Sequence, residues 1–326
     1  ICSVFGTREV LHGWFGMIDR GFWRGRKVLL TGHTGFKGSW MVLLLHRLGS
    51  VVSGYALDPP TEPSLFREAR LSDLVEDNRG DIRNEEQLET LLSEFSPEIV
   101  IHMAAQPLVR ESYRNPIETF EVNVMGTANV IEACKHFKSV KSVVVVTTDK
   151  CYENKEWIWP YRETDSLGGF DPYSASKACT ELLTASYLRS FYTSKGIATA
   201  RAGNVIGGGD WACDRLLPDI IRSLEAGGSL VIRYPEAIRP WQHVLDPLLG
   251  YLSLAENLHK DPEKFSGAWN FGPDLSDTRS VADVLEESEK LFPQFSWILD
   301  CAGENPHEAS TLKLDISKSI AMLDWR

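Results

Sequence analysis

Short apolar runs alternate with segments of helical length over the first two-thirds of the chain. The apolar runs are KVLLTG, VVSGYA, EIVIHMAA, SVVVVTT and IATARAG, at residues 27–32, 51–56, 98–105, 142–148 and 197–203. Between them we expect helices in FKGSWMVLLLHRLG and at about residues 84–95, 116–137 and 172–194. Strands that are apolar at every position, such as SVVVV, are typical of parallel sheets covered on both faces. The alternation therefore predicts an α/β fold with a doubly wound, mostly parallel sheet.

The pattern changes after residue 204. Gly, Pro and Trp become frequent, and only LVIRY, WQHVLD and AWNFG suggest short strands. We therefore expect a smaller C-terminal lobe over residues 204–326, from which a segment near 240–273 returns to the main sheet. Residues 1–16 precede Met17 and lack the basic start and continuous apolar stretch of a signal peptide. We expect them to be an upstream extension.

Charge and cysteine usage limit the partners of the chain. Its net charge is −11 and its isoelectric point is near 5.3, which disfavours a general nucleic-acid binder because phosphate backbones need a basic face. No apolar run approaches the roughly 20 residues that span a membrane. The six cysteines are scattered, without the spacing of a metal site. Together these features favour a cytoplasmic protein in a reducing compartment, with no metal and no membrane partner.

A glycine-rich turn follows the first predicted strand. In TGHTGFKG, Gly32, Gly35 and Gly38 have the spacing G-x-x-G-x-x-G. Glycines at such a turn let the backbone approach a pyrophosphate, which the N-terminus of the next helix attracts. The turn predicts a Rossmann-like dinucleotide-binding domain over residues 17–203; the alternative is a glycine-rich turn without a ligand. His33 could donate a hydrogen bond to phosphate, or be an ordinary surface residue.

Acidic residues follow the next two strands. Asp58 lies 26 residues after Gly32, where a carboxylate can accept hydrogen bonds from a ribose 2′-hydroxyl and so favour NAD over NADP. The alternative is a solvated loop residue. Asp81 and Ile82 end the third strand and could contact an adenine edge or belong to a helix cap.

Two pairs of residues carry acid–base chemistry. In YSASK, Tyr173 and Lys177 are four residues apart and project from one helix face. A nearby ammonium lowers the pKa of a phenol, so we expect Tyr173 to act as a base near neutral pH. Asp149 and Lys150 follow the strand that ends in Thr147 and Thr148.

These motifs together resemble a known family. TGHTGFKG, HMAAQ, Asn123 in NVMGT, TTD and YSASK resemble the extended short-chain dehydrogenase/reductases that act on nucleotide sugars, from about residue 22 to the end. TGHTGFKGSW, HMAAQPLVR, TTDKCYEN, DPYSASK, RAGNVIGGGDW, IRPWQHVL and PHEA resemble the CDP-glucose 4,6-dehydratase branch.

The resemblance implies a lyase reaction with NAD as a recycled cofactor. CDP-glucose would be oxidised at C4, lose water across C5 and C6, and receive hydride at C6, giving CDP-4-keto-6-deoxyglucose for deoxysugar and lipopolysaccharide O-antigen synthesis. It implies that Tyr173 takes the C4 hydroxyl proton and Lys177 holds the nicotinamide ribose. It also implies that Thr148 bonds the C4 oxygen and Asp149 protonates the departing C6 hydroxyl.

Lys150 stands where related dTDP-glucose dehydratases have glutamate. A neutral Lys150 could remove the C5 proton, which needs a pKa far below its ordinary value. A charged Lys150 could stabilise the C4 enolate and leave the proton to Tyr173 or water. The third possibility is a plain ion pair with Asp149 or a neighbour.

The resemblance also supplies binding residues and partners. It implies cofactor contacts by Phe36, Ala104 and Ala105, and substrate contacts by Gln106, Asn204, Arg215, Arg239 and His307. Arg239 could instead form a surface salt bridge, and Arg201 a structural ion pair. The helices at 116–137 and 172–194 would pair subunits in a homodimer or homotetramer. Another dehydratase, an epimerase, or a catalytically silent NAD-binding protein remain alternatives, and the choice of cytosine rests on the resemblance alone.

Overall fold

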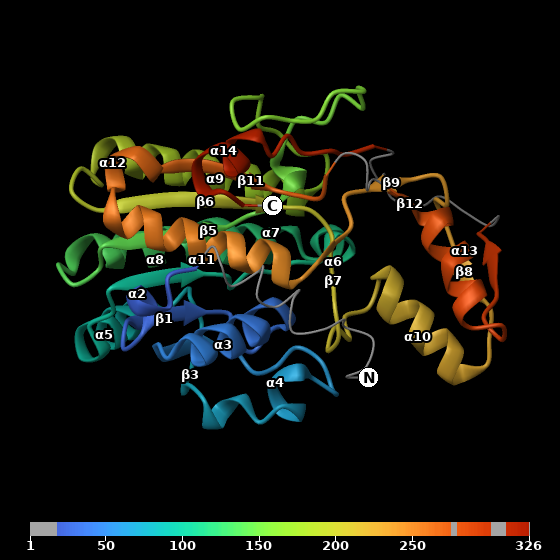
Figure 1. Cartoon of the computed structure of the whole chain (residues 1–326), viewed down its shortest axis with the longest axis horizontal. Coiled ribbons are helices and arrows are strands. Elements are labelled where there is room, and N and C mark those ends of the chain that lie inside the picture. The colour runs from blue at the N-terminus through green and yellow to red at the C-terminus, as the bar shows by residue number, and fades with distance from the viewer. Residues whose placement is uncertain (1–17, 275–278, 301–310, 326) are drawn as a thin grey trace.

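The computed structural model describes residues 18–274, 279–300 and 311–325. They form a large α/β lobe and a small lobe beside it (Figure 1). The expected upstream extension at residues 1–16 and the candidate His307 lie outside the described residues. Within the ranges that are described, no helix has the length and apolar character needed to cross a membrane.

The large lobe is built on one parallel sheet of seven strands. Their order is β11-β6-β5-β4-β1-β2-β3. The strands are β1 Lys27–Thr31, β2 Val51–Ala56, β3 Glu76–Arg79, β4 Ile99–His102, β5 Ser142–Val146, β6 Gly196–Ala202 and β11 Gly267–Phe271. The order runs outward in both directions from β1 and β4, and ligands of such sheets bind at this switch point. The predicted doubly wound, Rossmann-like sheet is confirmed.

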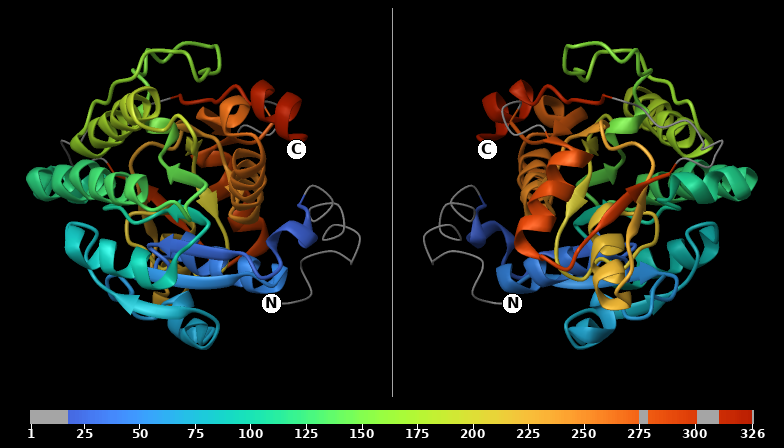
Figure 2. Two further views of the ribbon diagram at one scale, coloured as in Figure 1. Left: turned by 90° about the vertical axis from the view of Figure 1, so that its left-hand side faces the viewer. Right: turned by 90° about the vertical axis from the view of Figure 1, so that its right-hand side faces the viewer.

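Helices cover both faces of the sheet, as the two end views in Figure 2 show. One face carries α3 Phe36–Leu48 and α11 Leu245–Lys260, with α2 Arg20–Trp23, α12 Pro262–Phe265 and α14 Ser317–Leu323 packed near them. The other face carries α5 Glu85–Phe95, α8 Gly126–His136 and α9 Pro172–Ser190. Every residue of β4 and β5 is buried, which explains why SVVVV has no polar alternation.

Local sequence signals set the ends of the main helices. Helix α3 stops at Gly49, which adopts φ 80° and returns its N–H to the carbonyls of the last turn. Helix α9 starts at Pro172 after the cap residue Asp171, whose carboxylate accepts the Ser174 N–H at 2.9 Å. The helix expected at 116–137 contains three parts: α7 Pro116–Phe120, the π-helical turn η2 Glu121–Met125, and α8.

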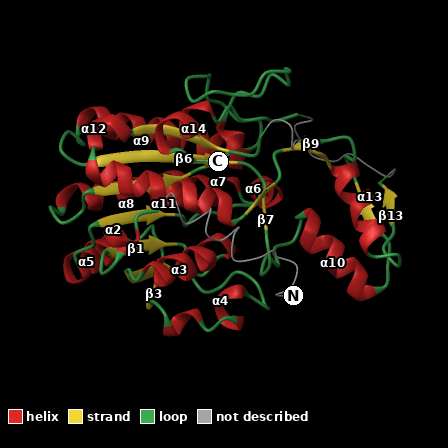
Figure 3. Ribbon diagram, in the orientation of Figure 1, coloured by secondary structure: helices red, strands yellow, loops and turns green. Residues whose placement is uncertain are grey.

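The small lobe lies beyond the carboxyl ends of the strands (Figure 3). It contains α10 Leu216–Ala226, α13 Val281–Leu291 and the short strand pairs β8 Leu230–Ile232 with β13 Trp297–Leu299 and β9 Ile238–Arg239 with β12 Arg279–Ser280. Ile220, Ile232, Leu285 and Phe295 form its own apolar core. Strands β7 Val205–Ile206 and β10 Gln242–His243 pair between the lobes.

Two stretches of the C-terminal third lie against the large lobe. The first contains α11 and β11, in the region near 240–273 where a return was expected. The helix α11 itself was missed, because only its preceding WQHVLD was considered, as a strand. The second stretch was not expected: α14 packs on α11 and β11, and the Trp325 indole N–H donates to the Asp246 carbonyl at 2.9 Å.

Candidate active site

A cavity of about 380 Å³ lies between the carboxyl ends of the strands and the small lobe. It brings together most of the residues that sequence analysis selected for catalysis and substrate binding. The predicted residues on its wall are Ala105, Thr148, Asp149, Lys150, Tyr173, Lys177, Asn204, Arg215 and Arg239. Residues more than 90 positions apart in the chain therefore meet in one place, although the role of each remains a prediction.

Asp149 lies at the start of the short helical turn η3 Asp149–Cys151, directly after β5. The Thr148 hydroxyl accepts the Lys150 N–H at 3.4 Å and donates to Asp149 Oδ1 at 3.0 Å. The carboxyl is only 2% exposed, and its Oδ2 has no hydrogen-bond partner in the part of the chain that is described. Burial raises the pKa of Asp149, against the opposing effects of Lys150, the Thr148 hydrogen bond and Arg239. This environment favours a protonated acid.

Tyr173 and Lys177 lie in the first turns of α9 and both face the cavity, as their spacing predicted. However, the expected lowering of the Tyr173 pKa is wrong. Burial raises this pKa to about 12, although a hydrogen bond with the Thr148 side chain opposes the rise. Burial also lowers the pKa of Lys177 to about 8, and its ammonium donates to the Val146 carbonyl at 3.3 Å. Desolvation outweighs the effect of one nearby cation on the phenol.

Lys150 is half-buried on the cavity wall. No carboxylate among the described residues lies within ion-pair distance of its ammonium, so the plain ion pair considered from sequence is not formed. Its charge still acts on Asp149 at longer range, since it lowers the pKa of that carboxyl. Lys150 thus lines the cavity, and none of the carboxylates in residues 18–274, 279–300 and 311–325 holds its ammonium.

Gln106 was expected to contact substrate; its side chain is engaged by protein groups, and the substrate contact stays a prediction. Its side-chain amide donates to the Leu108 carbonyl at 3.1 Å and to the Thr119 hydroxyl at 2.9 Å, and it does not line the cavity. Its backbone is held by Asn123, which lies in the π-helical turn and also donates to the Ser176 hydroxyl at 2.9 Å. Asn123 thus ties the segment after β4 to the catalytic helix α9.

The glycine-rich turn is packed too closely for side chains. A Cβ on Gly32, which adopts φ 75°, would lie 2.7 Å from the Ala104 nitrogen. A Cβ on Gly38 would lie 2.1 Å from the Gly32 carbonyl oxygen. Gly35 is the N-cap of α3 and has no side chain that could accept a hydrogen bond from the helix. The first backbone N–H groups of α3, starting at Phe36, can therefore donate hydrogen bonds to a ligand or to water. This cradle fits the pyrophosphate of a dinucleotide.

His33 is not part of the phosphate cradle, and both expectations for it are wrong. The imidazole is fully buried beneath β2, with Nε2 2.8 Å from Asp77 Oδ1 and an edge contact to Phe66. Space for the ring exists because residue 54 is glycine: a Cβ there would lie 2.4 Å from the imidazole. Burial lowers the pKa of His33 despite the Asp77 hydrogen bond. Gly54 in VVSGYA is the sequence feature that could have indicated that a side chain, here His33, packs against β2.

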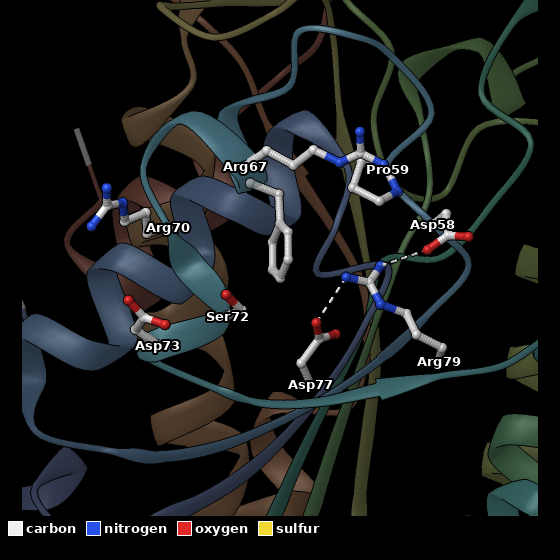
Figure 4. Close-up of a pocket in the computed structure, with 9 residues that line it drawn as sticks. Asp58, Pro59, Arg67, Arg70, Ser72, Asp73, Asp77 and Arg79 are labelled. Carbon is white, nitrogen blue, oxygen red and sulfur yellow. Dashed lines mark hydrogen bonds and ion pairs between the residues drawn. The ribbon is translucent and has the colours of Figure 1, made fainter.

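The acidic residues after β2 and β3 have different surroundings. The Asp58 side chain is 86% exposed, and its carboxylate lies 3.8 Å from the Arg79 guanidinium (Figure 4). The Asp81 carboxylate is bonded by Arg83, which lowers its pKa, and it does not cap α5, whose N-cap is Asn84. Ile82 is buried against Gly126. Asp58 is therefore the carboxylate whose position suits a ribose hydroxyl.

The arginines after residue 200 divide into two groups. Arg239 is 9% exposed and Arg215 bonds Asp210 at 2.8 Å, and both line the cavity. Arg201 does not line it. Its guanidinium is buried and bonds Glu181 at 2.7 Å and the Tyr152 hydroxyl at 2.8 Å, so Arg201 forms the structural ion pair considered from sequence.

Sequence analysis did not select three basic residues that line the cavity: Lys37, Arg110 and Arg233. Lys37 lies in the first turn of α3 and donates to the Tyr251 hydroxyl at 3.1 Å. Burial, together with Arg215 and Lys177, lowers the pKa of Lys37 to about 7. Its place inside the glycine-rich turn was the available signal. In all, seven Lys and Arg side chains and four Asp side chains line the cavity, so an acidic protein has a basic site.

Comparisons with known proteins agree with this geometry. The NAD dependent epimerase/dehydratase family model matches residues 28–272. A CDP-glucose 4,6-dehydratase from Salmonella typhimurium is 53% identical over 318 residues, which cover 95% of this chain and 88% of that protein. A UDP-glucose 4-epimerase from Halalkalibacterium halodurans is 30% identical over 79% of this chain and 78% of that protein.

Solved structures show the same fold. A dTDP-glucose 4,6-dehydratase from Streptomyces venezuelae, crystallised with NAD and TYD bound, aligns with a TM-score of 0.77 at 22% identity. The alignment covers 92% of this chain and 91% of that one. The chain belongs to the NAD dependent epimerase/dehydratase family.

Proposed function

We propose that this protein is a lyase that converts CDP-glucose to CDP-4-keto-6-deoxyglucose with NAD. The observation that carries the proposal is Asp149, a buried acid beside Thr148 and Tyr173 in one cavity. A C4 epimerase has no leaving group at C6 and needs no such acid. The 53% identity to a protein named CDP-glucose 4,6-dehydratase supports both the reaction and the choice of nucleotide.

The glycine cradle of Gly32, Gly35 and Gly38, with Phe36 and Ala105 beside it, would hold NAD. When bound, NAD supplies a hydride acceptor at C4 and returns the hydride to C6. Asp58 would accept hydrogen bonds from the adenosine ribose.

Tyr173 exchanges a proton with the C4 hydroxyl in this proposal. Tyr173 must be a phenolate when it takes this proton, so its phenol first gives up its own proton to solvent; its raised pKa then makes the phenol the stable product of the transfer from the sugar. The hydrogen bond with the Thr148 side chain opposes the rise of the Tyr173 pKa, and we expect the single Thr148 hydroxyl proton to turn from Asp149 Oδ1 to the C4 oxygen when substrate binds. Lys177 holds the nicotinamide ribose from the next turn of α9.

Asp149 gives its proton to the departing C6 hydroxyl. Burial raises the pKa of the Asp149 carboxyl, which favours the protonated state that an acid needs before elimination. Oxidation at C4 makes the C5 proton acidic, and Lys150 then acts on C5 from the cavity wall. As a cation, Lys150 stabilises the enolate that forms when the C5 proton passes to water, and water returns a proton to C5 when hydride is added at C6.

The basic wall binds the nucleoside diphosphate. Arg239 and Arg215 are planar guanidinium groups that can bond two phosphate oxygens at once, and Asn204 with Gly207 adds polar backbone beside them. Arg110 and Arg233 extend the positive charge.

We further infer a cytoplasmic enzyme that works as a homodimer or homotetramer in deoxysugar synthesis for lipopolysaccharide O-antigen. Ile117, Met125 and Leu182 are more than half exposed on α7, η2 and α9, which supports subunit pairing through these helices. The described cysteines, Cys134, Cys151, Cys179 and Cys213, are all unpaired with one another, as in a reducing compartment.

Mass spectrometry of the reaction tests the function. The protein and NAD are incubated in parallel with CDP-, UDP-, dTDP- and GDP-glucose, with Asp149→Asn as the matched control. We expect loss of one water from CDP-glucose alone, and none with Asp149→Asn. Loss from another nucleotide would refute the cytosine assignment, and conversion without loss of mass would indicate an epimerase.

A further inference from the structure

The active-site cavity extends past the residues assigned to catalysis and to the diphosphate, into the space between α10 and β8 of the small lobe. Its wall there is largely apolar. Leu217 and Pro218 line it from α10, and the exposed side chains of Val231 and Tyr234 line it from β8 and the turn that follows. Apolar and aromatic side chains of this kind contact flat rings. This end of the cavity therefore suits an aromatic part of the ligand.

The order of groups in a nucleotide sugar determines which part reaches this end. The hexose, the diphosphate, the ribose and the base follow one another along the molecule. In the proposed function the hexose lies at Asp149 and the diphosphate at Arg215 and Arg239. Helix α10 starts directly after Arg215 and lies in the small lobe (Figure 1). The base, at the far end from the hexose, then lies between α10 and β8.

An acid lines this end of the cavity. Of the aspartates on the cavity wall, three are the proposed acid and two ion-pair partners of arginines on the same wall: Asp149, Asp210 and Asp214. The fourth in the described chain, Asp219, pairs with Arg222, which does not line the cavity. A carboxylate in a site for an anionic substrate repels that substrate unless it meets a hydrogen-bond donor. Asp219 therefore points to a donor on the ligand.

The contacts of Asp219 leave one of its oxygens for such a donor. The Arg222 guanidinium donates to Oδ1 of Asp219 and to the carbonyls of Trp211 and Ala212, each at 3.0 Å. No hydrogen bond from the described residues reaches Oδ2 of Asp219. Burial raises the pKa of Asp219, and the hydrogen bond from Arg222 opposes this rise. Asp219 is thus a fixed and partly desolvated acceptor.

The pyrimidine bases differ at the position that such an acceptor can read. Cytosine carries an amino group at C4, which donates, whereas uracil and thymine carry an oxygen there, which accepts. Carboxylates accept hydrogen bonds from the cytosine amino group at base edges. An oxygen in its place would face the carboxylate without a hydrogen between them, and both acceptors would stay unpaired away from water.

We propose that Asp219 selects cytosine, with Oδ2 accepting a hydrogen bond from the 4-amino group of the base while Val231 and Tyr234 contact its ring. The inference rests on the proposed function, because that function places the hexose at Asp149 and the diphosphate at the arginines. Asp219 then discriminates against UDP-sugars and dTDP-sugars alike, since uracil and thymine have the same oxygen at C4.

Titration calorimetry with CDP and UDP, in the presence of NAD, tests the role of Asp219. These two ligands share the ribose and the diphosphate, so the ratio of their affinities reports on the base alone. The proteins are wild type, Asp219→Asn and Asp219→Ala, with melting temperatures to verify each fold. Glu225→Gln is the matched control, because it makes the same change of charge on the same helix at an exposed position outside the cavity.

We expect wild type to bind CDP at least about tenfold more tightly than UDP. Asp219→Asn should bring this ratio close to one, because the asparagine amide can donate to the uracil oxygen as well as accept from the cytosine amino group. Asp219→Ala should weaken CDP binding and leave UDP binding unchanged or tighter. Glu225→Gln should keep the wild-type ratio.

A purely structural role of Asp219, as an acid that stabilises the first turn of α10, would lower the affinities for CDP and UDP equally. That result, a ratio unchanged in Asp219→Asn, or an equal change in Glu225→Gln would overturn the inference alone. Wild type that binds UDP as tightly as CDP would overturn it together with the cytosine assignment. Failure of the proposed reaction appears separately, as a preference for CDP without dehydration of CDP-glucose.

Discussion

The two halves of the parallel sheet each carry an arginine beside a carboxylate, and the two pairs differ in burial and in separation. Under the active site, Arg201 of β6 bonds Glu181 of α9 at 2.7 Å, with side chains 3% and 2% exposed. At the opposite edge, Arg79 and Asp58 are 3.8 Å apart, with side chains 35% and 86% exposed. The same two charges therefore face very different solvation.

The buried pair holds the catalytic end together. Glu181 also accepts hydrogen bonds from the hydroxyls of Thr147 and Thr199, one at the end of β5 and one on β6. The Arg201 guanidinium donates a hydrogen bond to the Tyr152 hydroxyl, which in turn donates to the side chain of Asn270 on β11. The exposed pair has no such network around Asp58. One pair is thus part of the scaffold, whereas the other can change partners when a ligand binds.

The largest expected effect is on turnover at the catalytic end. Tyr173→Phe removes only the phenolic oxygen, so we expect a loss of about 100- to 10,000-fold in kcat with little change in melting temperature. Steady-state kinetics with CDP-glucose measure the loss. Activity within a few fold of wild type would remove Tyr173 from the mechanism.

Breaking the buried pair is expected to reduce stability strongly. Arg201→Met leaves the Glu181 carboxylate buried without its cation, which costs about 3–5 kcal/mol of unfolding free energy. Denaturant titration measures the cost. The double variant Glu181→Gln, Arg201→Met is the control, because it removes both charges and should recover part of the loss. A cost below about 1 kcal/mol would mean that the buried pair behaves like the exposed one.

Lys37 extends the comparison to a single, partly buried amine on the cavity wall. Its pKa of about 7 in the folded protein lies below the ordinary 10.5, so the unfolded chain binds more protons between these values. Stability should therefore rise with pH across this window. Relative to Lys37→Met, we expect wild type to gain roughly 2 kcal/mol of unfolding free energy between pH 7 and pH 9. Parallel pH profiles of the two proteins would contradict the lowered pKa.

The smallest expected effect is at the exposed pair. Arg79→Met should change the unfolding free energy by less than about 1 kcal/mol, because solvent screens these charges. The same denaturant titration makes the comparison with Arg201→Met direct. A loss as large as that of Arg201→Met would show that Arg79 belongs to the scaffold.

The sequence predicts those features that depend on local spacing. Alternating runs give the parallel sheet, and an interval of four residues places Tyr173 and Lys177 on one face. It does not predict properties that depend on burial by distant segments. The imidazole of His33 bonds Asp77, 44 residues later in the chain, and therefore does not face the expected phosphate. The pKa of Tyr173 is raised because the assembled cavity removes the phenol from water.

The cations of the cavity illustrate the same limit. Arg110 lies on a short helix α6 Val109–Arg114 and pairs at 3.3 Å with Asp214, more than one hundred residues later. No local pattern marks Arg110 as a cavity residue, because the cavity exists only where the small lobe meets the strand ends. Lys37 could have been noticed, since a charged residue in the first turn of α3 is next to the expected phosphate.

The position of β11 has a consequence for how the protein is made. Strand β6 ends at residue 202, but its outer neighbour β11 begins only at residue 267, after the chain has passed through the first part of the small lobe and helix α11. During synthesis, β6 is therefore an unpaired sheet edge until those later residues leave the ribosome. Such an edge can pair with the wrong chain, so this protein has a period of aggregation risk that ends when β11 docks.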